Sequence, residues 1–310
     1  MINYEKYFHG KTIWVIGCSS GIGADLVLRL AQLECNVILS ARRKENLDLL
    51  KEKCDAKSST RSSVVFPLDV TNFEQIRENC RKVNTFYGKV DVIILCCGRS
   101  QRSQWIIVDP KVDEACFRVN ALGPTVLARE YLKTMKTDEN GSFPAIHFVV
   151  VSSVAGVIGT VLSPSYTAAK HALMEFIVRD ETYPREILNS QGYFRSLALE
   201  YTAKGVAVSI VCPSLTFSPN NVLNAFTSNI DEKNGEVVSE PNAAYMSTAR
   251  CAQLILLAAS NKISECWLSE TTPVLLLCYF STVMPGITNR IVQFIGIERI
   301  KNIRTGKNVV

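Results

Sequence analysis

The chain has 310 residues, of which 47% are hydrophobic and 20% charged, and its net charge at pH 7 is +5. This length suits one α/β domain close to the size limit of a single core. The basic residues are scattered without interleaved aromatic side chains, which argues against a nucleic-acid-binding protein.

Eleven cysteines and three histidines raise the question of a metal or disulfide site. No Cys-x-x-Cys pair occurs, and His9, His147 and His171 do not have the spacing of a zinc motif, so we predict no metal site. The cysteines are expected to be reduced and packed as small apolar side chains in an intracellular protein. His147, within a predicted strand, is interpreted as a core or edge residue.

Short apolar segments alternate with helical stretches seven times. The predicted strands lie near residues 12–16, 37–40, 64–67, 90–96, 146–152, 207–212 and 266–268. This alternation predicts a single Rossmann-like, doubly wound parallel sheet of about seven strands, flanked by helices. Residues 1–270 are expected to form the nucleotide-binding domain. Residues 271–310 are an apolar helical extension, either part of that domain or a lid that faces a membrane or the substrate.

A glycine-rich turn follows the first predicted strand. Its spacing is Gly-x-x-x-Gly-x-Gly, and the next predicted helix, 24–33, has an apolar stripe. Glycines let the backbone turn sharply and approach a diphosphate, whose charge then lies at the positive end of the helix. The turn alone is a weak signal, but the strand before it and the helix after it strengthen the prediction. The cofactor-binding residues predicted here are Gly17, Ser19, Ser20, Gly21, Ile22 and Gly23.

The second predicted strand is followed by Arg42, with no acidic residue before Glu45. An acid at this place usually binds the ribose hydroxyl of NAD, whereas an arginine suits the 2′-phosphate of NADP. Arg42 therefore favours NADP(H) over NAD(H), and a solvated basic helix start is the alternative. Asp69, followed by Val70 at the end of the third strand, is predicted to accept the adenine amino group, to cap a helix, or both.

Tyr166 and Lys170 are four residues apart in a predicted helix, and Ser153 precedes the tyrosine by thirteen residues. Positions i and i+4 share one face of a helix, so the ammonium group can lie beside the phenol. A free phenol keeps its proton until pH about 10, and a nearby cation favours the phenolate. Such a tyrosine can exchange a proton with a carbonyl or alcohol oxygen, to which Ser153 would offer a hydroxyl.

Together these motifs resemble the classical short-chain dehydrogenase/reductases over roughly residues 10–270. The resemblance implies that Ser153 orients the substrate and that Tyr166 is the general acid/base. It implies that Lys170 makes the tyrosine more acidic and holds the nicotinamide ribose, while Asn120 holds a water in a proton relay. Further cofactor contacts are implied for Gly98, Pro213 and Ser218. Segments 98–103, 246–251, 265–270 and 291–307 resemble one subgroup of this family.

The sequence also departs from the family pattern. Cys96-Cys97-Gly98 stands where the family has Asn-Asn-Ala-Gly, so an amide that braces the sheet is missing. Ser214 replaces a glycine and would be strained wherever a positive φ is required. A polar insertion, residues 177–191, either loops out or breaks the helix at Pro184.

The predicted activity is an NADP(H)-dependent carbonyl reductase or alcohol dehydrogenase. The resemblance implies lipophilic substrates such as steroids or retinoids. One alternative is a nucleotide-binding protein without turnover, disabled by the insertion at 177–191 and by the Cys96-Cys97 change. Another is an NAD-dependent epimerase or dehydratase that uses the same tyrosine.

Neither a signal peptide nor an N-terminal anchor is predicted, because the first ten residues contain no apolar run. We expect an intracellular protein, either cytoplasmic or associated with the endoplasmic reticulum membrane, the latter implied by the resemblance. Residues 274–297 are apolar but interrupted at Pro285, Gly286 and Arg290, too short for a membrane span. They are interpreted as a peripheral membrane contact (273–297), a substrate lid or a packing element. A homodimer is a further prediction implied by the family.

Overall fold

The computed structural model describes residues 4–58, 62–174, 192–235 and 245–295. Seven strands form one sheet in which every neighbouring pair is parallel. They are β1 (Thr12–Ile16), β2 (Asn36–Ser40), β3 (Ser63–Val65), β4 (Val92–Leu95), β5 (Ile146–Val151), β6 (Val206–Pro213) and β9 (Glu265–Leu268). The predicted doubly wound parallel sheet is therefore confirmed.

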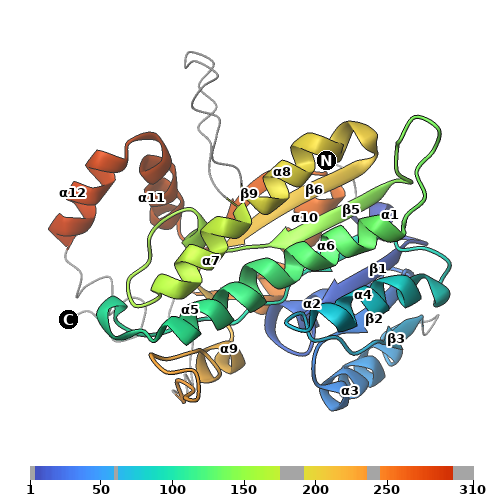
Figure 1. The fold of residues 1–310 in the computed structure, drawn as a ribbon, viewed down its shortest axis with the longest axis horizontal. Helices are drawn as coiled ribbons and strands as arrows, with labels where there is room; N and C mark the ends of the chain where they lie inside the picture. Colours follow the sequence, from blue (N-terminus) through green and yellow to red (C-terminus); the bar gives the residue numbers. More distant parts are fainter. Residues whose placement is uncertain (1–3, 59–61, 175–191, 236–244, 296–310) are drawn as a thin grey trace.

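Helices cover both faces of the sheet (Figure 1). Helices α4 (Phe73–Lys82), α6 (Gly123–Thr134), α7 (Pro164–Met174) and α8 (Tyr193–Tyr201) pack on one face. Helices α1 (Tyr4–Phe8), α2 (Gly21–Leu30), α3 (Lys44–Asp55) and α10 (Thr248–Ser260) pack on the other. The remaining α-helices are α5 (Pro110–Phe117), α9 (Pro219–Leu223), α11 (Thr272–Val283) and α12 (Pro285–Ile295).

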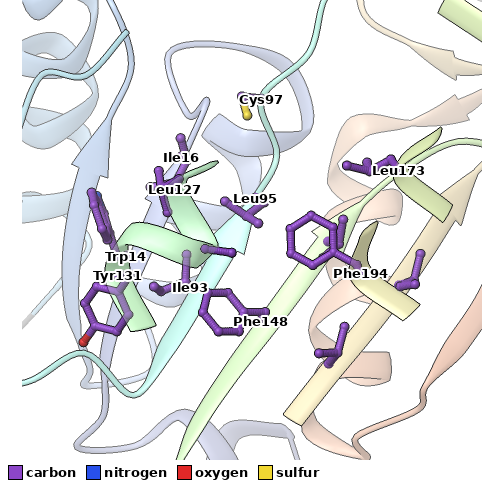
Figure 2. Close-up of a cluster of buried hydrophobic side chains, with 14 of the residues drawn as sticks. Trp14, Ile16, Ile93, Leu95, Cys97, Leu127, Tyr131, Phe148, Leu173 and Phe194 are labelled. Carbon is purple, nitrogen blue, oxygen red and sulfur yellow. The ribbon is translucent and has the colours of Figure 1, made fainter. Parts of the chain in front are cut away.

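Alternate residues of each strand enter different cores, because successive side chains point to opposite faces of a sheet. In β1, Trp14 and Ile16 join the core under α4, α6, α7 and α8, whereas Ile13 and Val15 join the core under α2 and α10. Figure 2 shows these side chains of the first core close to α6, with Trp14 beside Tyr131 and Ile16 beside Leu127. A strand buried on both faces is an apolar run, which is why these strands could be recognised in the sequence.

The strand order is β3-β2-β1-β4-β5-β6-β9, so the chain reverses its direction of winding between β1 and β4. The connections that leave these two strands diverge to opposite faces, which opens a crevice beyond their carboxyl ends. The glycine turn follows β1, and Cys96, Cys97 and Gly98 follow β4. Both predicted cofactor segments therefore lie at this crevice.

Local details differ from three of the sequence predictions. The second α-helix begins at Gly21 and not at residue 24, because Ser20 is its extended N-cap residue. Asp69 does not cap the following helix: Asn72 does, with its side chain accepting from the Gln75 amide at 3.0 Å. Ser214 is not among the described residues with a positive φ, so the strain considered for it is absent.

Helices α7 and α8 lie end to end along one line (Figure 1). The predicted insertion, 177–191, falls between them and lies outside the described residues. A second, two-stranded parallel sheet, β7 (Thr216–Phe217) and β8 (Met246–Ser247), joins the segment after β6 to the start of α10.

Candidate active site

A cleft of about 540 Å3 lies at the crevice between β1 and β4. It brings together most of the cofactor-binding residues predicted from the sequence. Its lining includes Gly17, Ser19, Ser20, Gly21, Ile22, Gly23, Arg42, Asp69, Val70, Gly98, Tyr166, Lys170 and Ser218. Pro213 is not in the lining; it ends β6, and its carbonyl oxygen accepts from the Ser153 hydroxyl at 3.4 Å.

The glycine turn leaves no room for side chains. Gly17 has φ +87°, and a Cβ there would lie 2.6 Å from the Cys97 backbone. A Cβ on Gly23 would lie 2.4 Å from the Gly17 carbonyl oxygen. Ser20 gives no side-chain cap to α2, so the first backbone amides of this helix stay available to an anion in the cleft.

Two arginines from different loops line the same cleft. Arg42 follows β2 and is exposed, whereas Arg99 follows β4 and is half-buried. Arg99 is held by the Asn224 carbonyl oxygen at 2.5 Å and by the Phe226 ring, whose centroid is 3.6 Å from the guanidinium carbon. Burial lowers the pKa of Arg99, and the charge of Arg42 lowers it further. Neither arginine forms an ion pair with a described residue.

Tyr166 and Lys170 come from the first turns of α7 and both line the cleft. Lys170 is only 2% exposed, and its ammonium group donates to the Val151 carbonyl oxygen at 3.2 Å. The same nitrogen lies 5.8 Å from the centroid of the Tyr166 ring. Phenol and cation therefore share one side of the helix, and the cation is fixed by β5.

Asn120 is fully buried and belongs to a π-helical turn, Arg118–Leu122, between α5 and α6. Its side-chain oxygen accepts from the Arg99 amide at 3.0 Å, and its nitrogen donates to the carbonyl oxygens of Arg99 and Cys116. Asn120 thus braces the loop after β4, where the sequence lacks the expected amide at Cys96-Cys97. It is not in the cleft lining, although a Cβ on Gly98 would lie 2.8 Å from its oxygen.

The two serines after β5 have different surroundings. The Ser153 hydroxyl accepts from the Ala155 amide at 3.1 Å and caps a short 3-10 helix, Val154–Gly156. Ser153 is not in the cleft lining. Ser152 does line the cleft; it is 5% exposed, and its hydroxyl has no hydrogen-bond partner among the described residues. A buried hydroxyl without a partner is costly unless a ligand or water supplies one.

The sequence reasoning missed part of the cleft wall. Besides Ser152, Arg99 and Arg118, it missed most of the segment after β6: Ser218 was predicted, but Thr216, Asn220, Asn221, Asn224 and Lys233 were not. The run of asparagines was a visible signal, but it is long-range contacts that bring this segment to the cleft, among them the β7–β8 pairing, the bridge between Phe226 and Gln101 and the bond of Asn224 to Arg99.

Residues outside the cleft behave as packing groups. His147 is 3% exposed, bonds to the hydroxyls of Tyr7 and Ser209, and has its pKa lowered by burial to about 4. All eleven cysteines are free; Cys96 and Cys97 line the cleft, and burial raises the pKa of Cys18, outside it, to about 12. Within the described ranges, no group of three His, Cys, Asp or Glu side chains is arranged to hold a metal ion. None of the described helices is long and apolar enough to cross a membrane.

Comparison with known families gives a direct match. The model of the short chain dehydrogenase family matches residues 11–187. Human dehydrogenase/reductase SDR family member 7 is 31% identical over 297 residues, which cover 95% of this chain and 80% of the human protein. The mouse protein of the same name is 30% identical over 94% of this chain and 80% of its own length. These relatives confirm the subgroup resemblance predicted from segments 98–103, 246–251, 265–270 and 291–307.

Solved structures share the fold at lower sequence identity. A short-chain dehydrogenase/reductase from Burkholderia phymatum in complex with NAD has a TM-score of 0.70 at 17% identity, covering 91% of this chain and 96% of that one. An alcohol dehydrogenase from Thermococcus sibiricus complexed with 5-hydroxy-NADP has a TM-score of 0.64 at 17% identity, covering 85% and 97%. One of these two structures holds NAD and the other an NADP analogue, so they do not decide between the two cofactors.

Proposed function

The chain belongs to the short-chain dehydrogenase family of oxidoreductases, and from this premise we propose that it is an NADP(H)-dependent carbonyl reductase or alcohol dehydrogenase. The observation that carries the proposal is one cleft lined by the glycine turn and by the Tyr166–Lys170 pair. A cleft of this kind can place a dinucleotide and a proton donor against the same reacting group.

The residues present fit a dinucleotide. The glycines let the turn pack closely, since a Cβ on Gly17 would meet the Cys97 backbone and one on Gly23 the Gly17 carbonyl oxygen. The uncapped start of α2 offers backbone amides to the diphosphate. Residues 17–23 would hold the diphosphate, Asp69 the adenine and Lys170 the nicotinamide ribose. When bound, NADP(H) supplies a hydride to the carbonyl carbon, or accepts one from the alcohol.

The protein's own part is the movement of one proton. In reduction, the O–H bond of Tyr166 would break and its proton would go to the carbonyl oxygen, which becomes the hydroxyl of the alcohol. Lys170 lies on the same side of α7, with its nitrogen 5.8 Å from the centroid of the Tyr166 ring, so its positive charge is close to the negative charge that would form on the phenol oxygen. Ser153 orients the substrate oxygen in this proposal, and Ser152 is a second candidate because its hydroxyl faces the cleft without a partner.

The preference for NADP(H) rests on Arg42 and Arg99. Two guanidinium groups that line one cleft without an acidic partner repel each other, and a phosphate between them removes that repulsion. The 2′-phosphate is the group that distinguishes NADP from NAD. A preference for NADH would contradict this part of the proposal and favour the epimerase or dehydratase alternative.

The substrates proposed are lipophilic ketones or secondary alcohols, such as steroids or retinoids. The test is a fluorescence titration with NADPH, followed by a panel of such ketones with NADPH oxidation as the readout. Oxidation on one or more ketones supports the proposal. Tight NADPH binding without oxidation on any substrate would favour the alternative of a nucleotide-binding protein without turnover.

A homodimer formed through the family's helices is also part of the proposal. Light scattering on the purified protein tests it, because a monomer would have half the expected mass.

A further inference from the structure

Several buried polar groups without a hydrogen-bond partner belong to segments that meet at the cleft. Among the described residues, a buried side-chain oxygen or nitrogen without a partner occurs in Asp55, Gln101, Arg102, Ser152 and Ser165. Ser152 lines the cleft, Ser165 immediately precedes Tyr166, and Gln101 and Arg102 belong to the loop after β4. A buried polar group that stays unpaired lowers stability. The segments around the cleft therefore hold groups whose partners a ligand could supply.

Gln101 has the largest unmet bonding capacity of these residues. It is fully buried, and neither the oxygen nor the nitrogen of its carboxamide has a partner. A carboxamide can accept two hydrogen bonds and donate two more. An apolar side chain of similar length would avoid the cost of leaving these bonds unmade. A carboxamide at this position is therefore better explained by binding than by packing.

Backbone contacts place Gln101 directly behind the wall of the cleft. Its neighbour Ser100 and its β-bridge partner Phe226 both line the cleft. In this bridge, the Phe226 amide donates to the Ser100 carbonyl oxygen at 2.9 Å, and the Arg102 amide donates to the Phe226 carbonyl oxygen at 2.7 Å. The Gln101 carbonyl oxygen accepts from the hydroxyl of Ser163, which lies just before α7. Gln101 is thus held between the segment after β6 and the start of α7.

The bridge also sets the direction of the Gln101 side chain. Opposed residues of a bridge have their side chains on the same side, as in other cross-strand pairs. Phe226 belongs to a buried cluster with Ala169 of α7, and Tyr166 packs against the same cluster. The carboxamide is therefore on the side of the proposed proton donor. Rotation about the bonds of this long side chain would bring it to a substrate in the cleft.

We propose that Gln101 determines substrate specificity: its carboxamide bonds to a second oxygen of the substrate, apart from the carbonyl that is reduced. This role rests on the proposed function and narrows its substrates to lipophilic ketones with one further hydroxyl or carbonyl group. The carboxamide is neutral and can both donate and accept, so it matches a neutral oxygen group. A site with such a buried group discriminates against an analogue that lacks the matching oxygen, because the protein's own group then stays unpaired.

The test compares ketones that differ in one hydroxyl group. One pair is para-tert-butylacetophenone and the analogue in which a hydroxyl replaces one methyl of the tert-butyl group. The corresponding meta-substituted and biphenyl pairs vary the distance between the two oxygens. NADPH oxidation gives kcat/KM for each ketone. We expect the wild type to prefer the hydroxylated member of at least one pair about 10- to 100-fold, and Gln101→Met to abolish this preference.

Gln104→Met is the matched control, because Gln104 lies in the same loop and is exposed. This variant should keep the wild-type preference. Thermal melting shows whether each variant is folded. Gln101→Met should melt at or above the wild-type temperature, since it removes a group that is unpaired in the unliganded protein.

Equal kcat/KM for both members of every pair in the wild type would overturn the proposed role of Gln101. An unchanged preference in Gln101→Met would overturn it as well. If Gln101→Met melts at a lower temperature and lowers kcat/KM equally for both members of each pair, Gln101 is a structural residue and the proposal is wrong. Oxidation of NADPH on no ketone at all would instead contradict the proposed function, on which this role depends.

Discussion

Side chains in the cleft and beside it are held by hydrogen bonds to the protein backbone. Lys170 donates to the Val151 carbonyl oxygen, and the Asn120 amide is bonded to the backbone of Arg99 and Cys116. By contrast, the Tyr166 hydroxyl has no hydrogen-bond partner among the described residues. Because Lys170 is already held in place and the Tyr166 hydroxyl is free to bond to a ligand, little further ordering of this pair is needed when a substrate binds. Such preorganisation favours catalysis by orientation.

Replacing Tyr166 with Phe should lower turnover about 10²- to 10⁴-fold, because the proton donor is removed. NADPH affinity should be nearly unchanged, since the ring remains in the cleft. Steady-state kinetics and an NADPH titration measure the two effects separately. Tyr193→Phe, at an exposed tyrosine of α8, is the control. Turnover like that of the wild type in Tyr166→Phe would end the assignment of this residue.

Replacing Arg42 or Arg99 with Gln should weaken NADPH binding about 10- to 100-fold, the range of one charge-assisted hydrogen bond. NADH affinity should stay the same, because NADH lacks the 2′-phosphate. Arg81→Gln, on the exposed side of α4, controls for loss of one positive charge. An unchanged ratio of NADPH to NADH affinity in both variants would show that neither arginine contacts that phosphate.

The sequence alone predicted the glycine turn, Arg42 and the Tyr166–Lys170 pair as site residues, because each could be recognised from residues close to it in the chain. The partners of individual side chains could not be predicted in this way. Ser152 and Ser153 are adjacent serines, and only the folded chain shows that Ser152 faces the cleft. Asp69 and Asn72 can both cap a helix, and the observed cap, Asn72, is decided by where α4 begins.

The glycine turn is the element whose geometry depends most on residue type. Gly17→Ala should lower the free energy of unfolding by about 2–4 kcal/mol, because it combines a φ of +87° with a contact of 2.6 Å to the Cys97 backbone. It should also weaken NADPH binding. Gly141→Ala is the matched control, since its φ is +73° but nothing lies within 4 Å, and it should lose only about 1 kcal/mol. Urea unfolding measures both; equal losses would show that crowding at Gly17 is unimportant.

At the scale of elements, the strands were predictable and several connections were not. β1 is a buried apolar run in the sequence and in the structure, because helices cover both faces of the sheet. The π-helical turn Arg118–Leu122 was not predicted from the sequence. Asn120 in this turn bonds to Arg99 of another loop, and such a long-range contact leaves no local sequence pattern. The segment after β6 joins the cleft through long-range contacts, which include the pairing of β7 with β8 and the bridge between Phe226 and Gln101.

For the whole molecule, the order of strands places functional residues from distant parts of the chain at the carboxyl edge of the sheet. The turn after β1, the loop after β4 and the start of α7 meet at the switch point of the sheet, so the proposed cofactor site and the proposed proton donor share one cleft. The exposed α11–α12 pair follows β9 at the same edge, because all strands of this sheet are parallel. The sequence predicted the parallel sheet but left the orientation of this extension open.

The stability of the whole molecule should depend on pH through His147. This side chain joins α1 to the sheet, since it bonds to Tyr7 of α1 and to Ser209 of β6. Burial lowers its pKa from 6.5 to about 4, so the unfolded chain binds a proton more tightly than the folded one. Stability is therefore fully present above about pH 6.5 and falls as the pH drops towards 4, by up to about 3 kcal/mol.

His147→Gln should remove this part of the pH dependence, because glutamine does not titrate, while it lowers stability at neutral pH through imperfect packing. Thermal melting of the wild type and the variant between pH 7 and about pH 4 measures the difference. Other groups titrate in both proteins, so only the difference in slope is assigned to His147. If His147→Gln keeps the wild-type slope, protonation of His147 does not open the contact between α1 and the sheet.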